Sequence, residues 1–211
     1  MAQEETSDAA VREATAELEA LIPDAGVAPA AIADFLDRRD GTTRPRIVRA
    51  LGRKAQRALY EKVAGFAPVA LVDLVPPDRA DLAEVRHLGR NTLPAFRIFE
   101  KRFCRLPGQT ADAPASLAGY NFQTMAAVTG PGYFVARNDE SKGEVLVDYT
   151  RLPELKPPDW PEIRSNERGL ARFVYGFMVD RLRRVSEHVT IGSAARNGRE
   201  LGSYFVLSRA D

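Results

Sequence analysis

The chain has 211 residues, 45% of them hydrophobic and 28% charged, with a formal net charge of +1. These are ordinary values for a globular protein with a sizeable core. The near-neutral charge gives no overall attraction to nucleic acid or to an anionic membrane, and the single cysteine, Cys104, excludes an intramolecular disulfide and a cysteine-rich zinc site. Because the chain shows neither a leader sequence nor an apolar run of about 18 residues, we expect a cytoplasmic protein without a membrane span.

The first part of the chain, residues 1–67, is predicted to be a helical segment, because it shows no strand-like alternation of apolar and polar residues. A first helix is expected over 8–21 and a second from about Pro29. A third helix is expected over 44–63, with its own apolar stripe.

The helix expected over 44–63 is the most basic stretch of the chain, and two interpretations of it are possible. It could contact DNA, as part of a helix-turn-helix in a ligand-sensing regulator. Alternatively it could pair with the acidic first helix inside the molecule. Tyr60 is its only aromatic residue for base stacking and the chain is almost neutral, so we favour the internal pairing.

Residues 68–92 are predicted to form a proline-containing linker that packs against the rest of the protein. The segment Val75-Pro76-Pro77-Asp78 marks the best boundary, since successive prolines can neither continue a helix nor occupy a central strand. His87 lies in this linker, and we interpret it as a surface or linker histidine and not as a ligand-binding group.

An α+β domain is expected over 93–211, and its first stretch, 93–106, fits two kinds of structure. Phenylalanines recur there at steps of three and four residues, as on one face of a helix, but part of the stretch also alternates as in a strand. The sequence alone leaves helix or strand open over 93–106. The phenylalanines concerned are Phe96, Phe99 and Phe103.

Three antiparallel strands are predicted over 117–152, joined by turns at 129–132 and 138–143. In the first strand, Ala118, Tyr120, Phe122, Thr124, Ala126 and Val128 share one face, which we expect to be core. The opposite face carries the amides of Asn121 and Gln123, and is either open to water or the wall of a pocket. The Thr129-Gly130-Pro131-Gly132 turn is followed by strand-forming residues, so it does not fit a phosphate-binding loop.

A long helix is predicted from about Ser165 to Val185, after a proline-rich connection that Trp160 should anchor. At helical spacing, Arg181 falls in the middle of an apolar stripe. An unpaired charge there would cost several kcal/mol. The guanidinium must therefore meet a carboxylate such as that of Asp148, reach solvent, or hold an anionic ligand.

The chain is expected to end in a β-hairpin whose turn is Asn197-Gly198, because a type I′ turn needs positive φ at both central positions. If the loop contains only these two residues, Ile191 faces Tyr204. Both faces of the hairpin are largely apolar, which predicts that both are covered. His188 lies at the junction between the long helix and this hairpin.

The predicted fold is α+β: an N-terminal helical segment followed by a mostly antiparallel curved sheet with one long packed helix and a C-terminal β-hairpin. Our leading hypothesis is a non-enzymatic protein that binds a small, mainly apolar ligand with an anionic end in a cavity between the sheet and the long helix. We expect no cofactor and no metal. Arg181 would hold the anionic end, and the remaining ligand-binding candidates are Asn121, Gln123, Thr190, Ser203 and His188.

Three alternatives remain open on the sequence. An enzyme could use His188 for proton transfer in the same cavity. A ligand-sensing regulator could contact DNA through 44–63. A structural or partner-binding protein would have no pocket at all.

Overall fold

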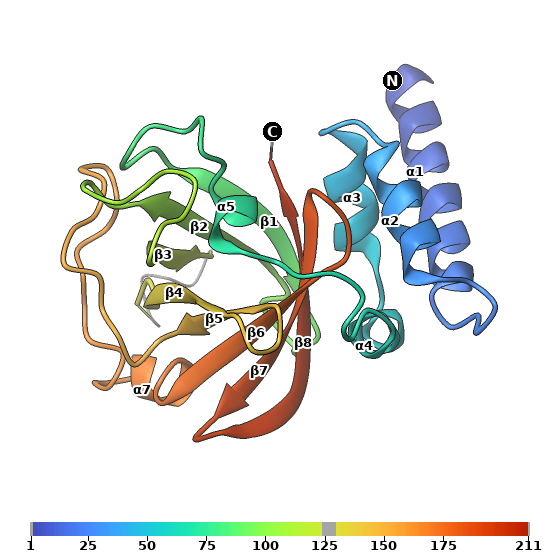
Figure 1. The fold of residues 1–211 in the computed structure, drawn as a ribbon. Coiled ribbons are helices and arrows are strands. Elements are labelled where there is room, and N and C mark those ends of the chain that lie inside the picture. Colours follow the sequence, from blue (N-terminus) through green and yellow to red (C-terminus); the bar gives the residue numbers. More distant parts are fainter. Residues whose placement is uncertain (1, 124–129, 211) are drawn as a thin grey trace.

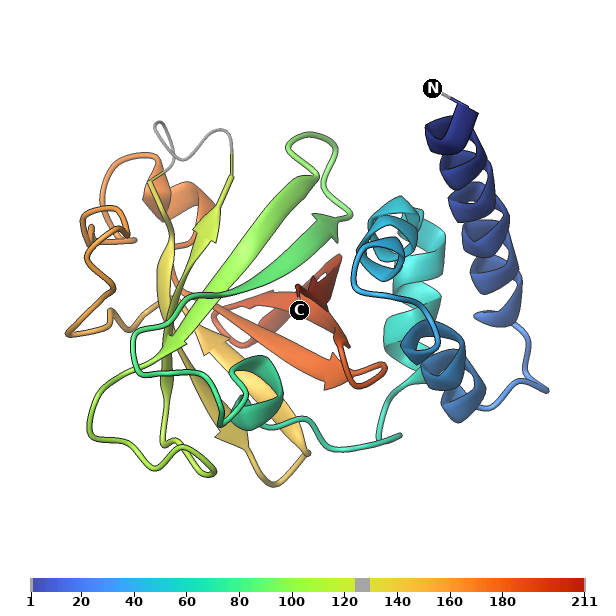
Figure 2. The same cartoon turned by 90° about the horizontal axis from the view of Figure 1, so that it is seen from above.

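The computed structural model describes residues 2–123 and 130–210, which form an N-terminal group of helices beside an eight-stranded antiparallel barrel (Figure 1). The N-terminal helices α1 to α4 lie against one side of the barrel (Figure 2). Two short helices belong to the barrel part of the chain. The helices are α1 (Ala2–Leu21), α2 (Pro29–Asp37), α3 (Thr43–Ala50), α4 (Arg53–Lys62), α5 (Leu71–Leu74) and α7 (Ala171–Val174).

The barrel is closed, because each strand pairs antiparallel with the next and β8 pairs with β1. The α+β class and the antiparallel sheet are confirmed, and the curved sheet is a closed barrel, which leaves no edge strand. The strands are β1 (Val85–Asn91), β2 (Ile98–Arg105), β3 (Leu117–Phe122), β4 (Tyr133–Asp139), β5 (Glu144–Asp148), β6 (Met178–Arg184), β7 (Val189–Arg196) and β8 (Arg199–Arg209).

The predicted long helix from about Ser165 to Val185 is wrong. Only the single turn of α7 is helical, and 178–184 form β6 between β5 and β7. Apolar residues four apart suggested a helix, but Asp180 and Leu182 point inward at strand spacing while Arg181 points outward. Closing the barrel supplies backbone partners on both sides of β6, which local sequence does not reveal.

The two stretches before the meander are also strands. Residues 98–105 form β2, so the strand alternative holds for most of 93–106. The range 68–92, expected to be a linker, contains α5 and β1. His87 is therefore buried inside the closed end of the barrel, and its Nε2 lies 2.9 Å from the carbonyl oxygen of Leu74. The interpretation of His87 as a surface histidine is wrong, because it alternates with exposed neighbours on a strand.

The single helix expected over 44–63 is two helices, broken at Leu51 and Gly52. The amide of Gly52 donates to Glu19 Oε1 of α1 at 2.8 Å, and this bond fixes the break between α3 and α4. Arg46 pairs with Asp8 of α1, as expected if the basic stretch pairs internally. Arg44 is buried and donates to the carbonyl oxygen of Leu36.

Three clusters of buried apolar side chains hold the molecule together. One fills the barrel, and includes Phe103, Phe134 and Leu182. A second joins the helices to the outer face of β7 and β8. The third covers the outer face of β2 to β4, where Trp160 packs on Tyr120 with ring centroids 4.8 Å apart.

The face of β3 that we assigned to the core is the outer face. Tyr120 packs under Trp160 outside the barrel, whereas Asn121 points into it. Both faces of β3 are covered, so alternation alone could not identify the interior. The predicted continuation of this strand through 124–128, and Thr129 of the next turn, lie outside the described residues.

The C-terminal hairpin turns at Asn197 and Gly198, which have φ values of 51° and 75°, and Arg196 faces Arg199. From Ser193 back to Val189, on the side away from the turn, the predicted register is wrong by two residues. An irregularity in the ladder shifts the pairing, so that Ile191 faces Val206 instead of Tyr204.

Candidate functional site

A cavity of about 330 Å³ opens at the end of the barrel where the β1–β2 loop, α7 and the β7–β8 hairpin meet. Figure 1 shows α7 and this hairpin at the same end of the barrel. The cavity wall is mainly apolar and aromatic. Its wall residues include Phe99, Tyr175, Met178, Ala194 and Phe205.

Four polar side chains form the floor of the cavity, and we call them the floor cluster: Lys101, Asn121, Tyr149 and Asp180. Lys101 Nζ donates to Asn121 Oδ1 at 3.1 Å and to Asp180 Oδ2 at 3.2 Å, and it also bonds the Tyr149 hydroxyl. Asn121 Nδ2 donates to the same hydroxyl at 3.0 Å. The cluster thus ties together strands from opposite sides of the barrel.

The floor cluster is almost completely removed from water: Lys101 is 1% exposed and Asp180 3%. Burial lowers the pKa of Lys101 and raises the pKa of Asp180, although each partly stabilises the charge of the other. Burial also raises the pKa of Tyr149 well above its usual value. Burial thus favours the uncharged form of each group, while the attraction between Lys101 and Asp180 favours the ion pair, so a neutral amine beside a carboxylic acid is an accessible alternative to the charged pair.

Aromatic rings surround the ammonium group of Lys101. Its Nζ lies 4.8 Å from the ring centroid of Phe205, 4.9 Å from that of Tyr149 and 5.1 Å from that of Phe134. Ring faces stabilise a cation electrostatically but replace none of its hydration. Lys101 therefore depends on its three hydrogen bonds.

One oxygen of the floor cluster has an open hydrogen-bonding position. Asp180 Oδ1 is buried and has no hydrogen-bond partner in the part of the chain that the structure describes. A buried carboxylate oxygen without a donor is costly, so this oxygen favours a hydrogen-bond donor. A molecule bound in the cavity could supply the donor.

Local sequence explains why the barrel has room for this arrangement. Gly192 faces inward, and a Cβ there would lie 2.3 Å from the ring of Phe205. Gly132 has a φ of 60° and allows the ring of Tyr175 to lie against it. Tyr175 then stacks on Tyr149 with centroids 5.4 Å apart, and its hydroxyl accepts from Gln123 Nε2 at 2.8 Å.

The structure brings together three of the six ligand-binding candidates. Asn121, Gln123 and Ser203 line the cavity, whereas Arg181, Thr190 and His188 do not. These last three depended on the long helix or on the unshifted hairpin register, and the barrel places them elsewhere.

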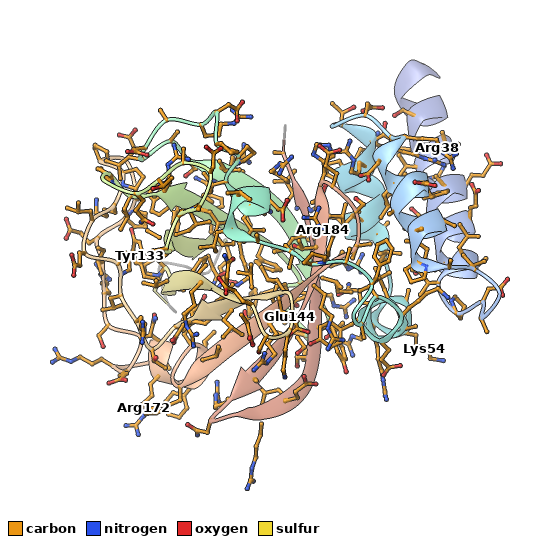
Figure 3. The ribbon with its side chains drawn as sticks, in the orientation of Figure 1. Arg38, Lys54, Tyr133, Glu144, Arg172 and Arg184 are labelled. Atoms are coloured by element: carbon orange, nitrogen blue, oxygen red, sulfur yellow. The ribbon has the colours of Figure 1, made fainter. Side chains whose placement is uncertain are left out.

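Arg181 lies on the outer face of β6, on the opposite side of the strand from the cavity. Its Nη1 donates to Asp139 Oδ2 at 3.0 Å and to Glu144 Oε2 at 3.3 Å. Glu144 lies on the outer face of β5 (Figure 3), where Arg183 also binds it. Carboxylates from the sheet thus compensate the charge of Arg181, but they are not the expected Asp148.

His188 and Thr190 lie toward the closed end of the barrel. His188 Nδ1 is 3.0 Å from Arg209, and its Nε2 is 3.8 Å from Glu187. Thr190 is buried opposite Leu207.

The sequence interpretation missed Lys101, Tyr149 and Asp180. Strand alternation over 98–105 aligns Lys101 with the buried Phe99 and Phe103. Asp180 likewise lies two residues before the buried Leu182 on β6, so strand alternation places both side chains on the same face. A charge in phase with apolar residues at a period of two was the available signal.

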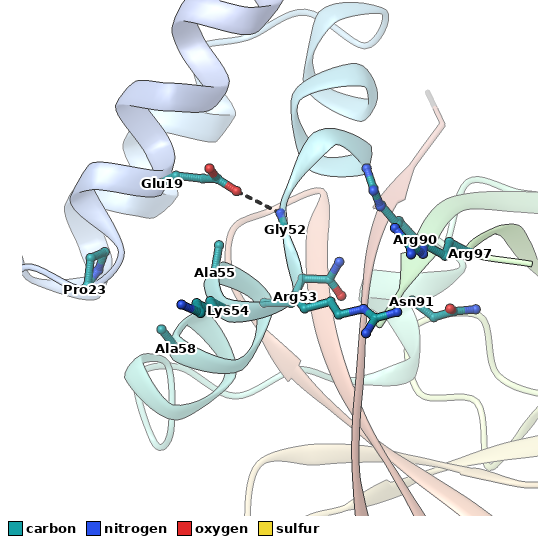
Figure 4. A pocket seen from close by; sticks show the side chains of 11 residues that line it. Glu19, Pro23, Gly52, Arg53, Lys54, Ala55, Ala58, Arg90, Asn91 and Arg97 are labelled. Atoms are coloured by element: carbon teal, nitrogen blue, oxygen red, sulfur yellow. Dashed lines mark hydrogen bonds between the residues drawn. The ribbon is translucent and has the colours of Figure 1, made fainter. Parts of the chain in front are cut away.

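A second hollow, of about 750 Å³, lies between the helices and the barrel (Figure 4). Four basic side chains line it, and three of them donate to backbone carbonyl oxygens. Arg53 and Arg97 both donate to the carbonyl oxygen of Leu93. Arg90 donates to the carbonyl oxygen of Arg49. These contacts join the two parts of the chain, so we assign this hollow a structural role.

The described residues contain no group of three or more His, Cys, Asp or Glu side chains arranged to hold a metal ion. None of the helices in the same residues combines the length and hydropathy needed to cross a membrane.

No protein-family model matches the chain, and comparisons with curated proteins and with solved structures gave no significant match.

Proposed function

We propose that this protein binds a small, mainly apolar ligand inside the barrel, with the polar end of the ligand on the floor cluster. The observation that carries the proposal is the buried, partnerless Asp180 Oδ1 in the floor of a largely aromatic cavity. Ligand cavities are commonly apolar with a few convergent polar groups, and this cavity fits that description.

The floor cluster favours a ligand whose inner end donates a hydrogen bond. The three hydrogens of Lys101 already have acceptors, whereas Asp180 Oδ1 accepts none from the described residues. A hydroxyl or amine group would satisfy this oxygen. The anionic end that we expected on Arg181 has no cation to meet at the floor, because Asp180 already pairs with Lys101.

The mouth of the cavity suits the outer part of an amphipathic molecule. Arg196 lines the cavity, and its Nε is buried without a partner among the residues described. An acceptor or anionic group on the ligand could bind there. Three exposed apolar side chains line the cavity: Leu93, Phe173 and Leu201.

A fluorescence titration with 1-aminoanthracene tests this function. The probe has an apolar body and one amine donor, and its emission increases on entering an apolar cavity. We expect saturable binding with a single site per chain. A phenylalanine at Ala194, which lines the cavity opposite Asp180, should abolish the binding by filling the space.

The matched control is Ala113→Phe, which adds the same ring at an exposed position outside the cavity. It should bind the probe as the unmodified protein does. If Ala194→Phe is folded by circular dichroism and binds as tightly as Ala113→Phe, the cavity is not the binding site.

A further inference from the structure

We infer that Lys101 captures an apolar aldehyde or ketone as an imine, so that the barrel is a carbonyl-binding site and not only a reversible pocket. This inference rests on the proposed function, because the carbonyl compound must first enter the cavity. It follows from the position of one primary amine and one acid at the floor of an aromatic cavity.

The first requirement for imine formation is an amine with a free electron pair. Lys101 is the most deeply buried lysine of the chain, and its burial among aromatic rings lowers its pKa. A desolvated lysine in an apolar pocket is the usual form of this nucleophile. The other four lysines are partly or fully exposed: Lys54, Lys62, Lys142 and Lys156.

The second requirement is a proton donor beside the amine. Asp180 Oδ2 lies 3.2 Å from Lys101 Nζ, and burial raises its pKa toward the protonated form. Asp180 Oδ1 remains available to the oxygen of the bound carbonyl compound. The acid can therefore reach both atoms between which protons must move.

The third requirement is that the amine can turn toward the ligand without disrupting the floor cluster. Asn121 Nδ2 donates to the Tyr149 hydroxyl at 3.0 Å, and that hydroxyl lies 3.3 Å from Asp180 Oδ2. These bonds persist when Nζ moves. Tyr149 and Asn121 therefore act as positioning residues that keep the acid in place.

The reaction balances with the groups present. The electron pair of Nζ forms a bond to the carbonyl carbon, and the carbonyl oxygen takes a proton from Asp180 to give a carbinolamine. The nitrogen returns a proton to Asp180, which protonates the hydroxyl as it leaves. Water leaves with the carbonyl oxygen, and the C=N bond that forms still carries one hydrogen on nitrogen, as an iminium ion beside the Asp180 carboxylate. Transfer of this last amine hydrogen to Asp180 gives the neutral imine and regenerates the acid.

Reductive trapping tests the inference on the full chain. The protein is incubated with 2-naphthaldehyde and sodium cyanoborohydride, which reduces an imine to a stable secondary amine, and peptide mass mapping locates the added naphthylmethyl group. We expect Lys101 to be labelled at least about tenfold faster than Lys54, Lys62, Lys142 or Lys156.

Two variants assign the chemistry. Lys101→Arg keeps the positive charge beside Asp180 but cannot form the imine, so the fast labelling should disappear. Asp180→Asn keeps the amine but removes the acid, and should slow labelling of Lys101 by at least about tenfold. Circular dichroism establishes that each variant is folded.

Competition with 2-naphthalenemethanol, the alcohol that corresponds to the aldehyde, separates the two proposals. If the alcohol displaces 1-aminoanthracene but Lys101 is labelled no faster than the surface lysines, the cavity binds ligands and the imine inference is overturned. If neither the alcohol nor the aldehyde displaces the probe, the proposed function itself fails. Fast labelling of Lys101 with displacement by both compounds supports both.

Discussion

The two faces of β6 place neighbouring charged side chains in opposite environments. The side chain of Asp180 points into the barrel and is 4% exposed, whereas the side chain of Arg181, one residue later, points outward and is 30% exposed. Inside, one carboxylate meets one ammonium group among aromatic rings. Outside, one guanidinium meets two carboxylates beside water. The comparison teaches that the strand period, and not the presence of a charge in an apolar stretch, decides which group can serve a ligand.

The largest expected effect comes from breaking the inner pair on one side. Lys101→Met leaves the Asp180 carboxylate buried without its counter-charge, and should lower the free energy of unfolding by about 3–5 kcal/mol. Urea unfolding followed by circular dichroism measures this change.

Replacing both members of the inner pair should remove most of that loss. The double variant Lys101→Met with Asp180→Leu substitutes apolar groups for both charges, which is often neutral or stabilising. If the double variant is as unstable as the sum of the single variants, the two side chains do not act as a pair.

His87 provides a second contrast between inside and outside, through its response to pH. Burial lowers its pKa to about 4, from a usual value of 6.5. Above pH 6.5 the His87 ring is neutral in both the folded and the unfolded chain, so its full contribution to the free energy of unfolding is present. As the pH falls from 6.5 to 4, the unfolded chain binds a proton that the folded chain does not, so stability decreases by about 3 kcal/mol.

His87→Gln removes the titration while keeping a donor for the carbonyl oxygen of Leu74. Melting temperatures measured from pH 7 to pH 4 should decrease more steeply for the unmodified protein than for the variant. Parallel curves for the two proteins would show that His87 titrates normally and is not enclosed.

The close packing inside the barrel is tested at Gly192. A Cβ at this position would lie 2.3 Å from the ring of Phe205, so Gly192→Ala should destabilise the protein by about 1–3 kcal/mol. A second change, Phe205→Leu, removes the conflicting ring and should make the alanine tolerable. A cost that is the same with Phe205 or with leucine would mean that the ring is not the cause.

The smallest effect is expected on the outer face. Arg181→Ala breaks a partly exposed cluster in which Arg183 still binds Glu144, so the loss should be about 1 kcal/mol or less and should shrink at high salt. Unfolding at low and high salt measures it. A loss that matches Lys101→Met would remove the contrast between the two faces.

The sequence could predict the α+β class, the N-terminal helices and the antiparallel meander, because each depends on local periodicity or on turn residues. It could not predict closure of the barrel, which depends on pairing between β1 and β8 across most of the chain. Unless the barrel is known to close, the sequence gives no reason to pair β1 or β6 with other strands. The same gap led us to interpret 165–185 as one helix.

The candidate site was predicted only in part, for a related reason. Asn121 and Gln123 were recognised because amides interrupt an apolar face. Lys101 and Asp180 were not, because each has a charged neighbour that makes the stretch look solvated. Their burial becomes evident only when strands far apart in the chain meet across the barrel.

The most direct test compares how the cavity binds 1-aminoanthracene and anthracene, which differ by one amine donor. In the unmodified protein the amine should bind about 10- to 100-fold more tightly, because its hydrogen bond to the Asp180 carboxylate contributes about 1.5–3 kcal/mol. Arg181→Ala should keep this preference, and the Lys101→Met with Asp180→Leu double variant should lose it. A preference that survives in the double variant and disappears in Arg181→Ala would contradict the account.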